Sequence, residues 1–463
     1  MGADYYTGLL DPLYAGGRWI IAVDAAAGAA ELAQRIINVG GEAVMVVAGT
    51  EGTGLQPPEE VTVFVVGVTG KSMMDGIRAF GAAIANPSSE LCAAIDSFDP
   101  TTDARVLTSY LIPAAEVCGR PVWGAVRPEW KALEDKLIVD DLWDRAGVER
   151  APSVIADSGS DSEMEKAVHS LSGPEGAVMV ADNSEGWHGG GEYARYLAPA
   201  ADHSDTFRFF TEHSRRVRVM PFLRGVPCSI HGLVTPDLVL AFRPVEMLVY
   251  RRAGSDDFVY AGMNTVWDPP AQVREDMRRT VRAVGSLIRR ELGYLGAFGI
   301  DGVNTAEGFL PTELNPRLTA GLGMQAEAAG GYPMGDINRA VIAGLDGDLR
   351  LRILEHAIVS GADASRAGRW LRPITHFSMT TTIDQPIAYN GSTWRPADQH
   401  DADATMSLGP SAQGALVLVK LADSHRLPIG RPIAQQAATA FTLADIIWDT
   451  RIGDLTPGTA SLV

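Results

Sequence analysis

Apolar runs of strand length alternate with amphipathic stretches over the first 125 residues. Residues 18–24 and 42–49 are almost continuously apolar, and the segment between them, 25–40, has helical spacing and ends at a glycine. A third apolar run follows at 61–68. This strand–helix–strand order predicts a small Rossmann-like α/β domain over residues 1–125. The turn after the first run lacks the GxGxxG pattern, so we expect no dinucleotide site there.

The middle of the chain combines strand-rich stretches with one long helix. Residues 128–153 have helical spacing with a stop at Gly147, and 176–197 has the pattern of two strands around a glycine-rich loop. Further strands are predicted within 216–234 and 238–252. The segment 269–294 begins with proline and predicts the best helix of the chain, with these apolar residues on one face: Met277, Val281, Val284 and Leu287.

A third region begins near residue 350. It has a helical stretch, a polar segment at 389–407, an apolar strand at 415–423 and a second helical stretch at 431–448. A chain of 463 residues is too long for one ordinary core, so we expect about three domains. The predicted fold class is therefore multidomain, with α/β and α+β parts.

Composition and charge exclude some classes of partner. Hydrophobic residues make up 46% of the chain and charged residues 21%, as in globular proteins, while the formal net charge is -18. Such an acidic surface argues against nucleic acid or an anionic membrane as partner. No apolar run approaches the ~20 residues that span a bilayer, and no signal peptide is visible. With three sparse cysteines (92, 118 and 228), we expect reduced thiols in a cytoplasmic protein.

The glycine-containing stretch GVTGKS (67–72) is similar to a phosphate-binding P-loop but does not fit one. A P-loop requires GxxxxGK followed by Ser or Thr, which puts its first glycine at the position of Val65. We therefore predict an ordinary strand-to-helix turn with a solvated Lys71.

The stretch FLPTELNPRL (309–318) carries polar residues at every second position. Glu313, Asn315 and Arg317 alternate with Leu314, Pro316 and Leu318. Because side chains alternate between the two faces of a strand, this spacing places the carboxylate, the amide and the guanidinium on one face. A solvent-facing strand with surface polar groups is the alternative.

A second strand completes this polar face. GIDGVNT (299–305) precedes FLPTELN (309–315), so a hairpin is predicted, and a three-residue loop places Asp301 directly opposite Glu313. Two opposed carboxylates are destabilising without a cation between them. Together with Asn315 they form an oxygen ligand set that suits Mg²⁺. A register slip of one residue would send Asp301 to the other face.

With this hairpin the chain resembles the ATP-grasp superfamily. GIDGVNTAEGFLPTELNPR is similar to that family's metal-binding strands, LEDKLIVDDLWDRAGVERAPS to its entry segment, and RVMPFLRGVPCSIHG to its adenine-holding hinge. The resemblance implies Asp301, Glu313 and Asn315 as Mg²⁺ ligands and Arg317 as the catalytic residue near the phosphates. It implies ATP binding by Lys136, by the hinge residues Met220, Pro221 and Phe222, and by the loop glycines Gly186, Gly189, Gly190 and Gly191.

A closer resemblance is to the pheganomycin-type peptide ligases of natural-product pathways. It is carried by FDP (98–100), GRPVWG (119–124), WKALEDK (130–136), MPFLRGVPCSIHG (220–232), FRPVEM (242–247) and DGVNTAEGFLPTELNPRLTAG (301–321). It implies a pre-ATP-grasp domain at 1–125, an ATP-grasp domain at 126–348 with its lid at about 150–220, and a small α+β domain at 349–463. The implied activity is ATP- and Mg²⁺-dependent joining of a small carboxylic acid to the amine of an amino acid or peptide. Family members are often dimers, so the resemblance also allows a homodimer.

The phosphate loop departs from the family pattern. The strand before the loop EGWHGGGE (185–192) ends in Ala181, Asp182 and Asn183, where relatives have a lysine. A missing cation beside a polyanion costs a few kcal/mol, and Asp182 and Glu185 add negative charge. A degenerate ATP-grasp protein acting as a binding or scaffold subunit is therefore one alternative function, and a phosphotransferase to a hydroxyl acceptor is another. His188 is expected to be solvated, although it could supply partial charge.

Other polar residues are weaker candidates. Cys228 is expected to be a packed thiol, because ligase chemistry needs no protein nucleophile. His231 is a candidate for substrate contact or for structuring a turn. Arg243 and Glu246 are candidates for substrate contact or for an ion pair with each other. Lys131 is expected to be a solvated charge at a helix start.

Overall fold

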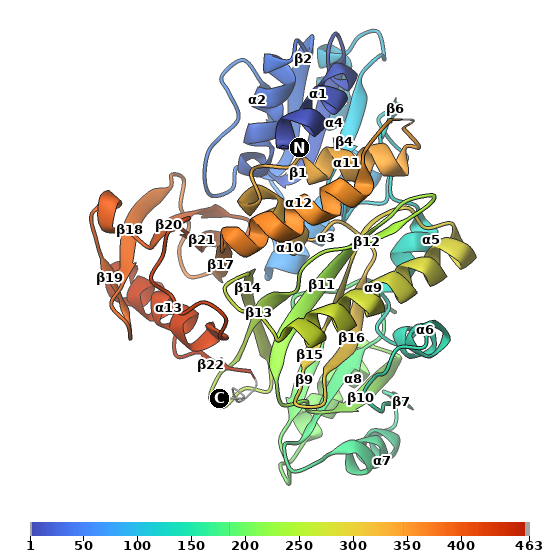
Figure 1. Ribbon diagram of the computed structural model, residues 1–463, viewed down its shortest axis with the longest axis vertical. Helices are drawn as coiled ribbons and strands as arrows, with labels where there is room; N and C mark the ends of the chain where they lie inside the picture. The colour runs from blue at the N-terminus through green and yellow to red at the C-terminus, as the bar shows by residue number, and fades with distance from the viewer. Residues whose placement is uncertain (1, 185, 346, 459–463) are drawn as a thin grey trace.

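The computed structural model describes residues 2–184, 186–345 and 347–458, in which three parts surround a central sheet (Figure 1). An N-terminal α/β unit lies at the top of the view, a smaller lid unit at the bottom, and the C-terminal strands and helix α13 (Ala434–Trp448) at one side. Both helices and sheets build the protein, as the sequence predicts. The boundaries expected near 125 and 348 stay predictions.

The N-terminal unit is a four-stranded parallel sheet with helices on both faces. Its strand order is β3-β2-β1-β4. Alternate side chains of the central strands enter two separate cores: Ile20 and Met45 lie in one, and Trp19 and Val44 in the other. Burial on both faces explains why these strands are continuously apolar. The elements are α1 (Ala3–Leu10), β1 (Arg18–Ala25), α2 (Ala30–Asn38), β2 (Ala43–Thr50), β3 (Thr62–Val65), α3 (Met73–Ala85), α4 (Ser89–Phe98), β4 (Arg105–Thr108), β5 (Glu116–Val117) and β6 (Arg120–Pro121).

The stretch 67–72 is the strand-to-helix turn that we predicted. Ser72 caps α3: its hydroxyl accepts a hydrogen bond from the Asp75 amide at 3.0 Å, and the Asp75 carboxylate accepts one from the Ser72 amide at 3.1 Å. This reciprocal pairing is a capping box. Lys71 is exposed.

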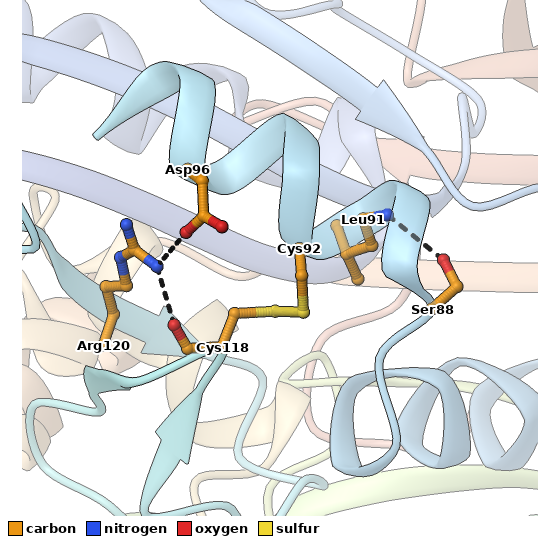
Figure 2. The surroundings of a disulfide bond; sticks show 6 residues. All are labelled: Ser88, Leu91, Cys92, Asp96, Cys118 and Arg120. Atoms are coloured by element: carbon orange, nitrogen blue, oxygen red, sulfur yellow. Dashed lines mark hydrogen bonds and ion pairs between the residues drawn. A yellow bond between two sulfur atoms is a disulfide. The ribbon is translucent and has the colours of Figure 1, made fainter. Parts of the chain in front are cut away.

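A disulfide joins Cys92 of α4 to Cys118 in the β5–β6 turn (Figure 2). Arg120 supports the turn, because its guanidinium donates to Asp96 of α4 at 2.6 Å and to the Cys118 carbonyl at 2.7 Å. The expectation of three reduced thiols is therefore wrong for this pair. Only Cys228 is a free thiol among the described residues.

The lid unit is a four-stranded antiparallel sheet with two helices on one face. Its strand order is β7-β10-β8-β9. Val217 and Val219 of one central strand pack with Met179 of its neighbour against the helices, so the residues between them point to the opposite face. The elements are β7 (Val154–Asp157), α7 (Asp161–Leu171), β8 (Ala177–Ala181), β9 (Ala194–Leu197), α8 (Ser204–His213) and β10 (Arg216–Pro221).

A large sheet forms the middle of the molecule and continues into the C-terminal part. Its order is β16-β15-β11-β13-β14-β17-β21-β20-β18-β19, with β12 beside β11 and β22 beside β13. The strands are β11 (Val226–Val234), β12 (Val239–Ala241), β13 (Val245–Arg251), β14 (Phe258–Asn264), β15 (Gly296–Asn304), β16 (Phe309–Asn315), β17 (Gly368–Ile374), β18 (Ile383–Tyr389), β19 (Trp394–Pro396), β20 (Ala404–Ser411), β21 (Gly414–Leu421) and β22 (Thr456–Pro457).

Helices cover the large sheet. The long helix α9 (Ala271–Leu292) crosses it (Figure 1) and buries the predicted apolar face, including Met277 and Val281, against Phe298 and Ile300. The remaining helices are α5 (Pro128–Lys131), α6 (Val139–Ala146), α10 (Ala320–Ala328), α11 (Met334–Ile342) and α12 (Leu351–Ala364). Within the described ranges, no helix has both the length and the apolar character needed to cross a membrane.

Candidate active site

A cavity of about 400 Å³ lies between the lid sheet and the large sheet. The strand alternation of the lid aims Val178, Val180, Arg218 and Met220 into it, because their neighbours in sequence pack against the lid helices. The large sheet supplies its polar residues, and α3 of the N-terminal unit adds an apolar wall that includes Met74. The N-terminal unit, the lid unit and the large sheet therefore all contribute to one site.

The hairpin β15–β16 brings Asp301 opposite Glu313, which confirms the predicted pairing. The predicted three-residue loop is wrong: Thr305 and Gly308 exchange backbone hydrogen bonds (2.8 and 3.3 Å), which leaves a two-residue turn. A register shift after Asp301 pairs Gly302 with Pro311 and makes Thr312 an extra residue in β16. This bulge compensates for the shorter turn.

Asp301 and Glu313 form a pair of carboxylates that face each other across the hairpin and line the cavity. Burial, with the charge of Glu313, raises the pKa of Asp301 to about 6. The Asn315 amide donates to Asp301 Oδ2 at 2.9 Å. Oxygen ligands of this kind fit Mg²⁺, which keeps some water or phosphate ligands of its own. The described ranges contain no group of three or more His, Cys, Asp or Glu placed to hold a metal, so the protein's share of such a site is two carboxylates and one amide.

Lys136 and His188 meet beside Glu313. The Lys136 ammonium lies 3.4 Å from Glu313 Oε2 and 3.4 Å from His188 Nδ1. Burial, followed by the charge of Lys136, lowers the pKa of His188 to about 3. The ring is therefore neutral, so its Nε2–H donates to the Asp182 carbonyl at 3.1 Å and its Nδ1 accepts from Lys136. The expectation that His188 is solvated is wrong, because the glycine-rich loop folds its ring under the lid.

Arg317 is fixed from two sides at the end of β16. Its Nε donates to Glu134 at 2.9 Å and its Nη2 donates to Asn315 Oδ1 at 2.8 Å. Glu134 also pairs with Lys131, whose ammonium lies 3.8 Å from the centre of the Trp187 ring. Lys131 is largely buried, and burial lowers its pKa to about 8. The expectation of a solvated Lys131 is therefore wrong.

The glycine-rich loop covers one end of the cavity. Gly189, Gly190 and Gly191 line it, whereas Gly186 is exposed and does not. Gly186, Gly190 and Gly191 have φ values of 99°, 62° and 81°, a region that favours glycine. Such a loop brings backbone N–H groups close to a bound anion. Glu185 lies outside the described residues.

Asp182 does not add charge to the cavity, contrary to our expectation. Its carboxylate accepts hydrogen bonds from the Arg216 amide at 2.9 Å and from the Ser184 hydroxyl at 2.6 Å. The residue is buried beside the β10 entry and is not part of the cavity lining. Ala181, where the resemblance implies a lysine, is buried in the lid core, and Asp182 adds no charge to the cavity.

The hinge residues Met220, Pro221 and Phe222 line the cavity where β10 leaves the lid. The Phe222 amide donates to the Gly176 carbonyl at 3.0 Å, which fixes the turn. Val249 of β13 also lines the cavity. These apolar surfaces suit a flat heterocycle.

Two of the proposed substrate residues lie elsewhere. Arg243 is fully buried and donates to Asp363 at 2.9 Å, while Glu246 accepts from the Ile433 amide at the start of α13 and from Asn264, each at 2.9 Å. Neither side chain lines the cavity. The alternative of a mutual ion pair is wrong, because each residue has its own partners.

His231 and Cys228 lie three positions apart on β11, so their side chains point to opposite faces of the sheet. His231 lines the cavity, fully buried, near Ser229 Oγ at 3.3 Å and Gln325 Nε2 at 3.2 Å. Burial lowers the pKa of His231 to about 3, so the ring is neutral. Cys228 is packed in the core as predicted, and burial raises the pKa of its thiol.

Sequence reasoning missed several residues of the site, among them Arg218, Trp187 and Thr319. Arg218 could have been found, since it alternates with Val217 and Val219 in a predicted strand. Trp187 and Thr319 gave no such signal, because only tertiary contacts bring them to the cavity. Thr319 Oγ1 is buried without a hydrogen-bond partner among the described residues.

Comparisons with known proteins identify the fold. No protein-family model matches the chain, and neither does any curated protein. Among solved structures it is similar to an N5-carboxyaminoimidazole ribonucleotide synthetase in complex with ADP, with a TM-score of 0.54 and 13% identity over 94% of this chain and 97% of that one. It is also similar to the biotin carboxylase of Campylobacter jejuni in a β,γ-ATP complex, with 0.57 and 12% over 89% and 88%. A third is the L-amino acid ligase of Bacillus licheniformis, with 0.50 and 12% over 88% and 93%. At these identities the likeness shows the fold alone: an ATP-grasp fold preceded by an α/β domain.

Proposed function

We propose that this protein is an ATP-dependent carboxylate–amine ligase that acts through an acyl phosphate. The observation that carries the proposal is the convergence of Asp301, Glu313, Asn315, Arg317 and Lys136 in one cavity of an ATP-grasp fold. Two carboxylates, an amide and two cations at a glycine-rich loop are the components that phosphoryl transfer requires.

The proposed reaction has two steps. An oxygen of the substrate carboxylate attacks the γ-phosphorus of ATP while the bond to the β,γ-bridging oxygen breaks, so ADP leaves with the electron pair. The amine of the second substrate then attacks the acyl carbon, the bond to phosphate breaks, and the nitrogen loses a proton to solvent. The products are an amide, ADP and phosphate.

The chain's own side chains have separable tasks. Lys136 and the N–H groups of residues 189–191 bind phosphate oxygens, and the apolar hinge residues around Met220 hold the base. Arg317, held by Glu134 and Asn315, keeps a fixed positive charge where the transferring phosphoryl group carries negative charge. Asp301, Glu313 and Asn315 would hold Mg²⁺, which neutralises phosphate charge when bound.

For the substrates we propose a small carboxylic acid and the amine of an amino acid or peptide. The fold likeness to an L-amino acid ligase and the resemblance to pheganomycin-type peptide ligases support this class, and they favour a role in peptide natural-product biosynthesis. The unpartnered Thr319 hydroxyl at the cavity wall supports a polar substrate group at the start of α10. Arg243 and Glu246 are not proposed as substrate contacts, because both are buried away from the cavity.

The test is a screen for ADP release that requires an acid and an amine together, with hydroxylamine added to trap the acyl phosphate as a hydroxamate. Glu313→Ala is expected to lose at least about a hundredfold in rate, or ~2.7 kcal/mol of barrier. Glu307→Ala is the matched control, because Glu307 is exposed at the turn of the same hairpin. Equal rates for the two variants would refute the assignment of the polar face.

Ala181 favours one alternative, a degenerate ATP-grasp protein that binds nucleotide without turnover. Tight binding of Mg·ATP with no product from any acid and amine would identify it, and activity restored by Ala181→Lys would show decayed catalysis. A stable phosphorylated product without an amide would instead identify a phosphotransferase to a hydroxyl acceptor.

A further inference from the structure

The glycine-rich loop has much conformational freedom to lose when it becomes ordered. Four of the residues between 186 and 191 are glycines, and glycine loses the most conformational freedom on ordering. The lysine that relatives carry before this loop is replaced by Ala181. Contacts from outside the loop must therefore fix its position over the cavity.

Lys131 and Lys136 contact Trp187 and His188 of the loop, and α3 of the N-terminal unit supplies further contacts. Arg78 donates through Nη1 to Glu192 Oε2 at 2.7 Å and through Nη2 to Glu192 Oε1 at 3.0 Å. The same Nη1 lies 3.4 Å from the Trp187 carbonyl, near the other end of the loop. The Ser72 hydroxyl adds a third hydrogen bond to Glu192, at 2.8 Å. One arginine thus contacts both ends of the loop.

Arg78 is itself held in place. Its Nη2 donates to Asp75 Oδ1 at 2.6 Å, one turn earlier on α3. Ser72 is held by the C-terminal part of the chain, because Gln413 Nε2 donates to the Ser72 carbonyl at 2.6 Å. Arg78 and Glu192 have only 23% and 21% of their side chains exposed, and their pairing is bidentate. Such a pair is stronger and more directional than an exposed one.

We propose that Arg78 is a positioning residue for the nucleotide: through Glu192 and the Trp187 carbonyl it holds the glycine-rich loop in its phosphate-binding position. The N-terminal unit, which lies outside the ATP-grasp fold, thereby supports the loop that lacks the family's lysine. The inference rests on the proposed function only in taking ATP as the ligand of the cavity.

The test uses the full chain and a non-hydrolysable ATP analogue with Mg²⁺, measured by calorimetry. Arg78→Met is expected to weaken binding at least about tenfold, which corresponds to ~1.4 kcal/mol. Glu192→Gln is expected to weaken it as well, and the double variant no more than Arg78→Met alone, because both act through one contact. Arg208→Met is the control, since Arg208 forms an exposed pair with Asp205 elsewhere on the lid.

Two further readouts separate positioning from mere stabilisation. The melting temperature of the nucleotide-free protein is expected to change little in Arg78→Met, while amide exchange of residues 186–192 becomes at least about fivefold faster as the loop opens. Arg78→Lys, which keeps one charged contact, is expected to recover part of the affinity. If Arg78→Met does not fold, Glu192→Gln, which is the milder substitution, tests the proposal by the same affinity and amide-exchange measurements.

The outcomes are distinguishable. If the unmodified protein binds no ATP analogue, the proposed function fails, and this inference fails with it. If it binds but Arg78→Met and Glu192→Gln bind within twofold of it with unchanged loop exchange, the inference alone is overturned. Additive losses in the double variant would also contradict it.

Discussion

Asp301→Asn is expected to stabilise the metal-free protein while abolishing its response to Mg²⁺. In the folded protein, Asp301 is largely buried and faces Glu313, so its ionised form is disfavoured. Asparagine has nearly the same shape and keeps an acceptor for the Asn315 amide, but it carries no charge. The substitution thus removes a repulsion that a bound cation would relieve.

The magnitude follows from the pKa of Asp301, which is raised from 3.8 to about 6. A carboxyl whose pKa is raised by folding costs almost nothing below its unfolded pKa; its cost grows as pH rises from the unfolded to the folded pKa and is nearly constant above that. Above pH 6 the shift corresponds to about 3 kcal/mol, whereas near pH 4.5 roughly 1 kcal/mol remains. Asp301→Asn should therefore gain up to about 3 kcal/mol at pH 7.5 and much less at pH 4.5.

The assay is denaturant unfolding in EDTA at both pH values, followed by thermal unfolding with added Mg²⁺. A cation that binds only the folded form stabilises by about 2.7 kcal/mol at a hundred times its Kd. The unmodified protein should show this gain, and Asp301→Asn should not. Asp205→Asn, at an exposed lid position, should match the unmodified protein within about 0.5 kcal/mol. An Asp301→Asn protein no more stable in EDTA at pH 7.5, or equally stabilised by Mg²⁺, would refute the reasoning.

Two other expectations concern stability outside the cavity. The Cys92–Cys118 disulfide closes a segment with a sequence separation of 26, so reduction should cost roughly 3–4 kcal/mol, measured as unfolding with and without dithiothreitol. A Cys92→Ser/Cys118→Ser variant should be insensitive to the reductant. Glu246→Ala leaves the amides at the start of α13 and the Asn264 side chain without their acceptor and should destabilise by about 3 kcal/mol. The KM values of the Glu246→Ala protein should stay unchanged. A rise in the KM for one substrate alone would contradict the role of Glu246 as a buried acceptor at the start of α13.

The polar face of the hairpin could be predicted because strand alternation is a local property. Glu313, Asn315 and Arg317 needed only the period of two, and Asp301 joined them through an assumed loop length. The turn is one residue shorter than assumed, and the bulge at Thr312 restores the pairing. Nothing in the residue type of Thr312 signals a bulge, so this agreement depended on two compensating features of the backbone.

Residues whose environment comes from distant segments could not be predicted. Lys131 and His188 are polar residues in polar stretches of sequence, which suggested solvent exposure. In the folded protein the glycine-rich loop lies over α5, and both side chains are buried. Arg243 and Glu246 lie three apart, which suggested a pair, but each has a partner more than a hundred residues away along the chain: Asp363 for Arg243 and Ile433 for Glu246. Spacing along the sequence reports only local neighbours.

The resemblance implies a lysine at position 181, where this chain has alanine. The folded protein shows what this difference removes from the site. Lys136, Arg218 and Arg317 line the cavity together with Asp301 and Glu313, while Glu134 pairs with Arg317 and Asp140 pairs with Arg218. In a cavity with low-dielectric walls, these cations attract a bound polyanion more strongly than they would in water. Three cations thus remain at the cavity, and what the loop loses without a lysine at 181 is mainly a fixed point of attachment. A fixed point can be supplied by any rigid neighbour, and α3 supplies one.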